Sequence, residues 1–433
     1  MSGRVKRRYL VIISMVLFCA SAMSTHPATS TVTNTNNNGP GSLRQALADA
    51  NDGDLINFAV TGTIVLTSGG LGIEKRVTIS GPGADQLSID GNQAQGQCVF
   101  GVARANAVTI SGLTITNGQC GIYNDHGTLT VIDCVVTGNS GFGLRADGSF
   151  GPQAERGNDN RDAKKISGDC PYACLTIANS IISDNSGPGV DNFSAIATIL
   201  NSTLTGNSAG QDPGYGGGVN TGGGKLPGNV TITNSTISGN SAFYGGGGIA
   251  SGFSVLTIVN STISSNSVGD PNDGYGGGIA AGGGGVPPAL TITNSTVSGN
   301  SAATCGGVCG GTVEIANTIL NENASGNIGG TVTSLGYNIC SDNGGGLLNG
   351  PGDQINTDPL LGPLQDNGGP TLTHLPLPGS PAIDAGDPNF TPPPSRDQRG
   401  PCFHRVFGRR IDIGSVETQP RPRCVTPVPR PAP

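Results

Sequence analysis

The sequence contains no tryptophan, few aromatic residues and few charged residues. Aromatic side chains make up 4% of the 433 residues and charged side chains 12%, whereas roughly 25% charged residues is usual in a globular domain. A core built on large aromatic side chains is therefore excluded. The chain instead contains 73 glycines. Its stability must come from many small aliphatic layers, in which each buried Val, Leu or Ile contributes roughly 1.5–3 kcal/mol.

The chain also lacks an apolar run long enough to cross a bilayer. Its longest N-terminal run, residues 9–20, is shorter than the roughly 20 residues that a spanning helix needs. Basic residues precede this run, and the small residues Ala20-Ser21-Ala22 follow it. This arrangement predicts a secretory signal peptide over residues 1–22. A membrane anchor, or a lipoprotein signal at Cys19, is a less favoured alternative, the latter because bulky Phe18 precedes the cysteine.

Positive charge is scarce beyond the N-terminus. Residues 1–22 hold four of the 22 basic residues and none of the 29 acidic ones, so the net charge of −7 becomes −11 without them. Such a surface disfavours nucleic acid as a partner. The four histidines show no mutual spacing that suggests a site; they are His26, His126, His374 and His404.

Ten cysteines remain after Cys19, an even number in an exported chain, which favours disulfides. The plausible pairs are Cys98/Cys120, Cys170/Cys174, Cys305/Cys309 and Cys402/Cys424. Zinc is the alternative. Zinc binding is disfavoured, because three residues separate the cysteines in each of the two close pairs and no histidine is spaced to complete a site.

One twelve-residue pattern recurs along the chain. Residues 175–186 read LTIANSIISDNS, and residues 230–241 read VTITNSTISGNS. Copies begin at residues 108, 129, 175, 197, 230, 256, 290 and 313, and the shortest steps between them are close to 22 residues. This period predicts a stack of similar coils, with insertions in the longer steps.

Apolar and polar residues alternate within each copy, as in a strand with one buried face. A shorter strand precedes several copies, as at Gly217-Gly218-Val219 and Gly247-Gly248-Ile249. Coils of this kind pair each strand with its equivalent in the next coil. The predicted fold is therefore all-β, a right-handed single-stranded parallel β-helix over residues 55–345.

Asparagine recurs at one bend of the predicted coil, where it tolerates a left-handed backbone. The predicted column contains Asn179, Asn201, Asn234, Asn260, Asn294 and Asn317. Four of these begin glycosylation sequons, namely Asn201, Asn234, Asn260 and Asn294. We favour the structural explanation over glycosylation, because the motif repeats wherever the bend repeats.

The two ends of the stack require covers. Residues 31–54 are predicted to form an N-terminal cap with a helix over residues 43–50, in which Ser42 is the N-cap and Gln45 completes a capping box. Strands are expected at residues 55–60, 63–66, 77–80 and 87–90. Residues 346–417 are predicted to cover the other end, and residues 418–433 to form a proline-rich disordered or extended tail.

Several segments resemble secreted bacterial β-helix proteins of the pectate-lyase-like superfamily that have a choice-of-anchor Q type C-terminal region. These segments are GSLRQAL at 41–47, VTISGPG at 77–83, GSPAIDAG at 379–386, DQRG at 397–400 and IDIGSVE at 411–417. The GGI and SGN pieces are also similar to repeats of polymorphic outer-membrane proteins. The resemblance implies a protein of the cell surface or exterior without a settled activity. No sorting motif accompanies it, which leaves the anchoring open.

Acidic residues are nearly absent from the repeat strands, whose outward positions carry Thr and Ser. Four other acidic residues are better explained as turn residues than as catalytic or calcium-binding residues; they are Asp133, Asp184, Asp270 and Asp273. The charged insert of residues 149–174 is better explained as a solvated loop. The most enzyme-like set, expected instead to form ion pairs that fix loops, contains Asp384, Asp397, Arg399, Arg410, Asp412 and Glu417.

No catalytic, cofactor-binding or metal-binding residue is assigned from the sequence. The favoured hypothesis is an exported adhesive or carbohydrate-binding scaffold, because threonines recur in one column at Thr176, Thr198, Thr231, Thr257 and Thr291. Its expected partner is an extracellular polysaccharide or a neighbouring cell surface. The alternative is a polysaccharide lyase or glycoside hydrolase, which rests on analogy of fold. Ice binding is a remote third hypothesis, because Ala178, Leu200 and Val259 interrupt the polar columns.

Overall fold

The computed structural model describes residues 27–93, 96–149, 172–211, 214–223, 228–282 and 289–420. The predicted signal peptide, nearly all of the insert at 149–174 and the tail from residue 421 lie outside these residues. No helix within the described ranges is both long and apolar enough to cross a membrane.

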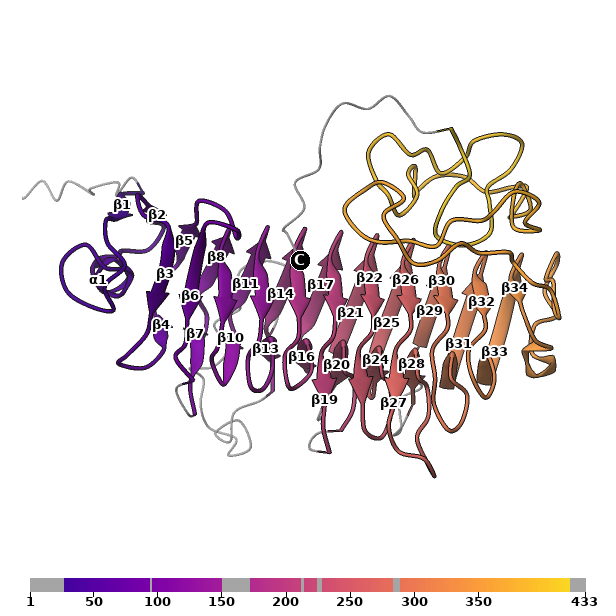
Figure 1. Cartoon of the computed structure of the whole chain (residues 1–433), viewed down its shortest axis with the longest axis horizontal. Coiled ribbons are helices and arrows are strands. Elements are labelled where there is room, and N and C mark those ends of the chain that lie inside the picture. The colour runs from indigo at the N-terminus through magenta and orange to yellow at the C-terminus, as the bar shows by residue number, and fades with distance from the viewer. Residues whose placement is uncertain are drawn as a thin grey trace, which may run out of the picture.

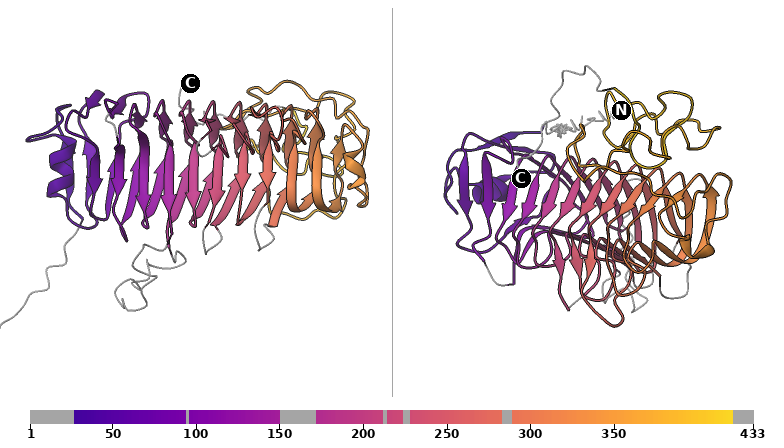
Figure 2. Two further views of the ribbon diagram at one scale, coloured as in Figure 1. Left: turned by 90° about the horizontal axis from the view of Figure 1, so that it is seen from below. Right: turned by 45° about the vertical axis from the view of Figure 1, so that its right-hand side comes forward.

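The chain forms a parallel β-helix, as predicted (Figure 1, Figure 2). Its strands belong to a 20-stranded sheet, an 11-stranded sheet and a 3-stranded sheet, which we call sheets A, B and C. One full coil runs through two strands of sheet A, one of sheet B and, in the middle of the stack, one of sheet C. Sheet A therefore has two arms, which join in β31 (Val308–Ala316), because β31 pairs with the last strand of each arm and then with β33 (Ile328–Gly336).

The first arm of sheet A contains the short strands that precede the repeats. They are β4 (Leu71–Ile73), β7 (Cys98–Val102), β10 (Cys120–Asp125), β13 (Leu144–Asp147), β16 (Val190–Phe193), β20 (Val219–Gly222), β24 (Ile249–Ser251) and β28 (Ile279–Ala281). The second arm contains β1 (Thr29–Val32), β2 (Leu55–Phe58), β5 (Val77–Ser80), β8 (Ala107–Ser111), β11 (Thr128–Ile132), β14 (Cys174–Ala178), β17 (Ile196–Leu200), β21 (Gly228–Thr233), β25 (Ser254–Val259) and β29 (Ala289–Thr293).

Sheet B follows the bend after each strand of the second arm. It contains β3 (Gly62–Val65), β6 (Leu87–Asp90), β9 (Thr114–Thr116), β12 (Val135–Thr137), β15 (Ile181–Ser183), β18 (Thr203–Thr205), β22 (Thr236–Ser238), β26 (Thr262–Ser264), β30 (Thr296–Ser298), β32 (Ile319–Asn321) and β34 (Ile339–Cys340). Sheet C contains β19 (Ser208–Ala209), β23 (Ser241–Ala242) and β27 (Ser267–Val268).

The repeat places equivalent aliphatic residues above one another in the core. Ile177 pairs with Ile199, Ile199 with Ile232, and Ile232 with Ile258, and each is fully buried. One continuous hydrophobic core runs from Val32 to Leu348. The threonine column lies in register on the outward face of the second arm, as expected for a period of two residues.

The predicted asparagine column is confirmed at the bend between the second arm and sheet B. Its six members have φ between 49° and 52°, in the left-handed region. Asn201 donates a hydrogen bond from Nδ2 to Oδ1 of Asn179, and Asn234 donates one to Asn201. Asp133 takes the same conformation at the start of the column, with φ of 53°.

A second asparagine column, which the sequence analysis missed, lies buried at the next bend. It contains Asn139, Asn185, Asn207, Asn240, Asn266, Asn300 and Asn323. Each member accepts two hydrogen bonds at Oδ1 from the preceding coil, one from a backbone N–H and one from a side-chain amide, except Asn139 at the start of the column. These bonds satisfy polar groups that would otherwise be costly to bury.

The N-terminal helix forms where it was predicted, as α1 (Leu43–Asp49). Ser42 Oγ accepts a hydrogen bond from the Gln45 backbone N–H, which caps the helix. Gln45 does not complete the capping box, because its side chain donates to Asp49 instead. Strand β1 was not predicted; it pairs in parallel with β2 and extends sheet A beyond the first coil.

The C-terminal region lies mainly along the side of the stack, which differs from the expected cover over its end. Residues near the short helix η2 (Gly344–Gly346) occupy the end, where Leu348 joins the core. The chain then turns back and covers β22, β26 and β30 of sheet B (Figure 1). Thr236 Oγ1 donates to the Leu372 carbonyl at 2.6 Å, and Thr262 Oγ1 donates to Gln398 Oε1 at 2.6 Å. The side-on position follows from the threonines on the outer face of sheet B. They supply hydrogen-bond partners for a segment that has no repeat of its own.

The predicted disulfide between Cys98 and Cys120 is present and joins β7 to β10. Cys174 and Cys402 are also disulfide-bonded, and the partners predicted for them, Cys170 and Cys424, lie outside the described residues. The predicted pair Cys305/Cys309 is wrong in this structure, since both are free thiols. The Cys305 thiol donates instead to the Val308 carbonyl at 2.9 Å.

Candidate functional site

Most acidic residues of the coils that the sequence singled out lie in turns, where they hold the backbone conformation. Asp184 lies at a bend with φ of 53°. The Asp270 carboxylate accepts a hydrogen bond from the Asn272 backbone N–H, which closes a turn. The described residues contain no group of three or more His, Cys, Asp or Glu side chains that is arranged to hold a metal ion.

Four of the six charged residues singled out in the C-terminal region are buried, whereas Asp384 is exposed and Arg410 is half-buried. Asp397 and Glu417 are fully buried, and Arg399 is 3% exposed. Arg399 Nη2 lies 2.6 Å from Asp397 Oδ2. The Glu417 carboxylate accepts hydrogen bonds from the backbone N–H groups of Phe407 and Asp412. These buried groups fix the loops through an ion pair and hydrogen bonds to the backbone.

Arg405, which the sequence analysis did not single out, connects this network to the coils. It is fully buried, and its Nη2 donates to the carbonyls of Asp412 and Gly414 and to Asn294 Oδ1 of the bend column. Burial lowers the pKa of the Arg405 guanidinium, whereas the charges of Glu417, Asp397 and Asp412 oppose that shift. Arg405 is therefore a structural cation that holds the C-terminal region against sheet B.

The structure instead brings together a set of polar side chains on the first arm of sheet A. Tyr123, Arg145, Asp191 and Asn220 occupy equivalent positions in β10, β13, β16 and β20. We call these four residues the polar row. Their preceding neighbours, such as Leu144 and Val190, are fully buried, so the alternation of the strand turns the row outward.

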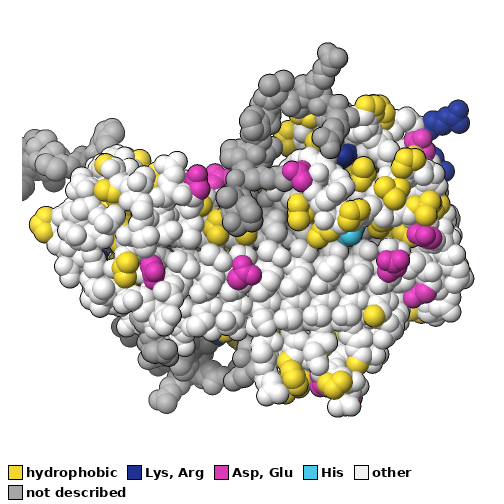
Figure 3. All heavy atoms as spheres, in the orientation of Figure 1, with side chains coloured by type: hydrophobic (Ala, Val, Ile, Leu, Met, Phe, Trp, Pro, Cys, Tyr) yellow, Lys and Arg dark blue, Asp and Glu magenta, His cyan; other side chains and the backbone are white. Residues whose placement is uncertain are grey.

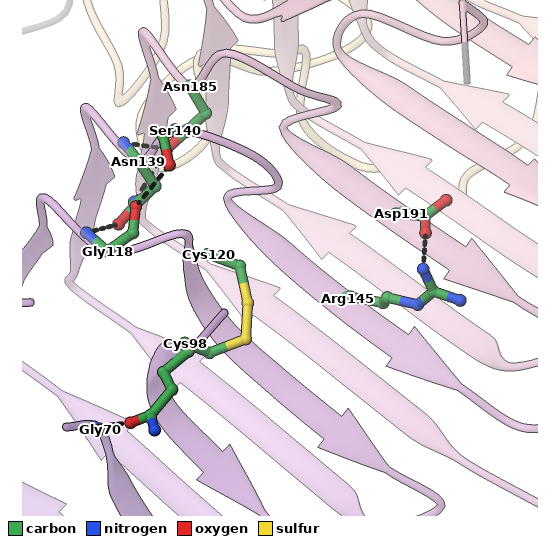
Figure 4. Close-up of a disulfide and its surroundings, with 10 residues drawn as sticks. Gly70, Cys98, Gly118, Cys120, Asn139, Ser140, Arg145, Asn185 and Asp191 are labelled. Carbon is green, nitrogen blue, oxygen red and sulfur yellow. Dashed lines mark hydrogen bonds and ion pairs between the residues drawn. A yellow bond between two sulfur atoms is a disulfide. The ribbon is translucent and has the colours of Figure 1, made fainter. Parts of the chain in front are cut away.

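Within the polar row, Arg145 forms an ion pair with Asp191 of the neighbouring strand (Figure 4). Its Nη1 lies 3.5 Å from Asp191 Oδ2, and its Nη2 lies 3.8 Å from Asp147 Oδ2. Asn220 Nδ2 donates to the other oxygen of Asp191 at 2.8 Å. The side chain of Arg145 is 33% exposed, and those of Asp147 and Asp191 are 14% and 9% exposed. The guanidinium thus connects two carboxylates at the surface.

Two features show that Arg145 and Asp191 are not fully neutralised by their neighbours. Arg145 Nε is buried and has no hydrogen-bond partner. Burial raises the pKa of the Asp191 carboxyl, and the Asp147 charge raises it further, against the opposing effects of Arg145 and Asn220. The row therefore contains an unused donor beside a carboxyl that holds its proton more tightly than usual.

Tyr123 and His126 adjoin the same charges. Tyr123 Oη lies 3.4 Å from Asp147 Oδ2. Burial, together with the negative charges of Asp147 and Asp125, raises the pKa of Tyr123 to about 12. Tyr123 is therefore a hydrogen-bond donor at neutral pH. His126 Nδ1 contacts Asp125, whose carboxylate also lies 4.0 Å from Arg104 Nη2.

The polar row is bounded by small residues along the stack. Gly72 and Gly101 occupy the equivalent positions before Tyr123, and a Cβ added to either would meet no atom within 4 Å. Ala250 and Ala280 follow Asn220. Charged side chains are sparse over most of the face drawn in Figure 3. The five charged residues around Tyr123 are thus a distinct cluster on the coils, separate from the buried network of the C-terminal region; they are Arg104, Asp125, Arg145, Asp147 and Asp191.

No family model and no curated protein matches the sequence. Among solved structures, the pectate lyase Pel9A has a TM-score of 0.53 and 13% identity, over 91% of this chain and 98% of its own. An alginate lyase from Paenibacillus sp. has a TM-score of 0.45 and 17% sequence identity, and the match covers 70% of this chain and 99% of the lyase chain. The A-module of the Azotobacter vinelandii mannuronan C-5 epimerase AlgE6 has a TM-score of 0.40 and 17% sequence identity. That match covers 76% of this chain and 83% of the module.

The likeness to Pel9A supports the parallel β-helix fold, which is the class of protein that the coils define. The finer resemblance, to choice-of-anchor Q proteins and to polymorphic outer-membrane repeats, stays a prediction.

Proposed function

We propose that this chain is an exported β-helix protein that binds an extracellular polysaccharide at the polar row. The observation that carries the proposal is Arg145, which lies between Asp147 and Asp191 with an unpartnered buried Nε. Export is supported by the predicted signal peptide and by the Cys98–Cys120 disulfide, a bond that persists in oxidising compartments.

The chemistry of the row suits sugar hydroxyls. A hydroxyl both donates and accepts hydrogen bonds, so its site needs fixed donors beside fixed acceptors. Arg145 and Tyr123 supply donors, the Asp147 carboxylate supplies acceptors, and the Asn220 amide supplies both. Because neighbouring rungs hold these groups in register, they are preorganised and lose little freedom when a polymer binds.

Cleavage of a glycosidic bond is the second candidate, favoured by the raised pKa of Asp191. Glycoside hydrolysis commonly uses one protonated carboxyl as the acid and a second carboxylate as the base or nucleophile. Asp191 is the candidate acid, and Asp147 on the neighbouring strand is the candidate second carboxylate. The pectate lyase activity named for Pel9A is a further reason to include pectate among the substrates tested.

The test is binding of the chain from residue 23 to 433 on a glycan array, with product analysis for every polysaccharide that gives a signal. Arg145→Gln should abolish binding, because it removes the central cation. The matched control is Arg76→Gln, which removes an arginine whose side chain is 61% exposed and paired with Asp52. Binding by Arg145→Gln at the level of the unmodified chain would refute the site.

Product analysis separates the two candidate functions. If the chain cleaves a bound polysaccharide, Asp191→Asn should retain binding and lose the shortened products. If no product appears from any bound polysaccharide, the protein binds without turnover, and the second candidate is excluded for those polymers.

A further inference from the structure

Four aromatic side chains gather on the loops that precede β20, β24 and β28. We call Tyr215, Phe243, Tyr244 and Tyr275 the aromatic platform. The loops have nearly the same sequence, with GYGGG at 214–218, YGGGG at 244–248 and GYGGG at 274–278. They stack on one another, because Tyr215 and Tyr275 both form parallel bridges with Gly245.

The tyrosines and glycines of adjacent loops are complementary. The middle loop carries its tyrosine one position earlier, so each ring lies beside a glycine of the next loop. A Cβ on Gly214 would lie 2.4 Å from the Tyr244 ring, and a Cβ on Gly245 would lie 3.1 Å from the Tyr275 ring and 3.4 Å from Tyr215. Glycine at these positions therefore makes the room in which the rings lie together.

The platform is exposed although the rest of the molecule uses few aromatic residues. Tyr215 is 39% exposed and Tyr244 is 37% exposed. Their ring centroids are 5.5 Å apart with an interplanar angle of 36°, and Phe243 packs edge-on against Tyr244 at 4.8 Å. Three of the six tyrosines beyond residue 22 lie here. Since the core does not need these rings, their exposure indicates a binding surface.

The platform continues the polar row. The loop that carries Tyr215 folds against Asn220, the last residue of the row, and a Cβ on Gly216 would lie 2.5 Å from Asn220 Cα. Gly216 has φ of +67°, so only glycine fits this turn without strain. The equivalent glycines Gly246 and Gly276 lie against Ala250 and Ala280, the positions that follow Asn220. The loops that carry the tyrosines therefore cover the continuation of the row.

Charge favours a neutral polymer on this surface. In the described parts of the three loops the charged residues are Asp270 and Asp273, of which Asp270 is half-buried and Asp273 is exposed two residues before Tyr275. The polar row and its neighbours add three carboxylates, of Asp125, Asp147 and Asp191, against two arginines. A polyuronate would be repelled, whereas the apolar face of an uncharged pyranose ring can pack on a tyrosine ring.

We infer that the aromatic platform stacks the pyranose rings of a neutral polysaccharide whose chain also crosses the polar row. The inference rests on the proposed function and adds to it a second contact surface and a substrate class. It predicts that affinity increases with oligosaccharide length up to the point at which both surfaces are occupied.

The experiment is native gel electrophoresis of the chain from residue 23 to 433 in gels that contain xylan, laminarin, dextran, polygalacturonate or alginate. The test variant is Tyr215→Ala/Tyr244→Ala, and its matched control is Tyr215→Phe/Tyr244→Phe, which keeps both rings. We expect a neutral polymer to retard the unmodified chain and the Phe variant, and the Ala variant to bind about tenfold more weakly. Because the chain has no tryptophan, a fluorescence change on binding comes from tyrosines, and the part of it that is absent from both variants belongs to Tyr215 and Tyr244.

The variants distinguish the two proposals. Retention by the Ala variant at the level of the unmodified chain, with loss in Arg145→Gln, overturns the platform and leaves the polar row. Loss in the Ala variant with full binding by Arg145→Gln supports the platform and overturns the row as the primary site. Retardation only in polygalacturonate or alginate overturns the neutral class, and retardation in none of the gels overturns both proposals. Circular dichroism of each variant confirms that the coils remain folded.

Discussion

The early and late coils have the same interior and different exteriors. At one outward position of the first arm, the early coils carry Tyr123, Arg145 and Asp191, whereas the late coils carry Ala250 and Ala280. The residue before each of the five is a fully buried aliphatic residue. The late coils are also covered on sheet B by the C-terminal region (Figure 1). The repeat therefore specifies the coil, while outward positions that the repeat does not fix differ between two surfaces. We call the surface of the polar row the binding face, and the part of sheet B under the C-terminal region the docking face.

The largest effect should come from breaking the docking face at Arg405. Arg405→Ala leaves the buried carbonyls of Asp412 and Gly414 without their donor and removes the cation near the Asp412 carboxylate, which together should cost about 3–5 kcal/mol. We expect the C-terminal region to leave sheet B, so that limited proteolysis cuts within residues 358–417 while the coils resist. Arg396→Ala, at a more exposed arginine of the same region, is the control. Equal protease resistance in both variants would show that Arg405 does not hold the region.

A smaller effect is expected inside the late coils, at the buried asparagine column. Asn240→Ala removes the acceptor for two hydrogen bonds from Asn207 and the donor to the Leu204 carbonyl. Each buried group left without a partner costs about 1–3 kcal/mol. Thermal unfolding should show a clear loss, and Asn229→Ala, at an exposed asparagine of β21, should show almost none. A melting temperature unchanged in Asn240→Ala would mean that water replaces the amide.

The docking face should also respond to pH through Glu417. Burial, followed by the nearby Asp412 charge, raises the pKa of Glu417 from 4.5 to about 8. The folded protein therefore holds this proton between these two pH values, whereas the unfolded chain has lost it. Stability from this group is complete below pH 4.5 and falls as the pH rises to about 8.

Glu417→Gln should flatten that pH dependence. It should also cost some stability at low pH, because the amide keeps one acceptor for the two backbone donors, Phe407 and Asp412. Protease resistance of the C-terminal region, measured from pH 4 to 9, reports the slope. A slope that is the same in Glu417→Gln and in the unmodified chain would assign it to another group.

The parts of the molecule predictable from the sequence are those that repeat in it. The frame of LTI and NS residues predicts the second arm, the bend and sheet B, because stacking requires the same residue types at each rung. The polar row was missed because its members share a position and not a residue type. Counting two residues on from Gly121, Gly143, Gly189 and Gly218 reaches all four members. The side-on C-terminal region has no repeat, so nothing in its sequence specifies its register against sheet B.

The smallest effect on stability should come from changes in the polar row. This prediction tests whether the row serves binding or stabilises the fold. Arg145→Gln with Asp191→Asn removes one charge of each sign and keeps similar volumes. The Asp147 carboxylate that remains still accepts hydrogen bonds from Tyr123 and Ser149. Replacing a partly buried ion pair in this way is often neutral or stabilising. We expect a melting temperature within about 2 °C of the unmodified chain, with polysaccharide binding lost. A fall as large as that of Arg405→Ala would instead make the row a structural brace, and the difference between the two faces would then lie only in which partner each one holds.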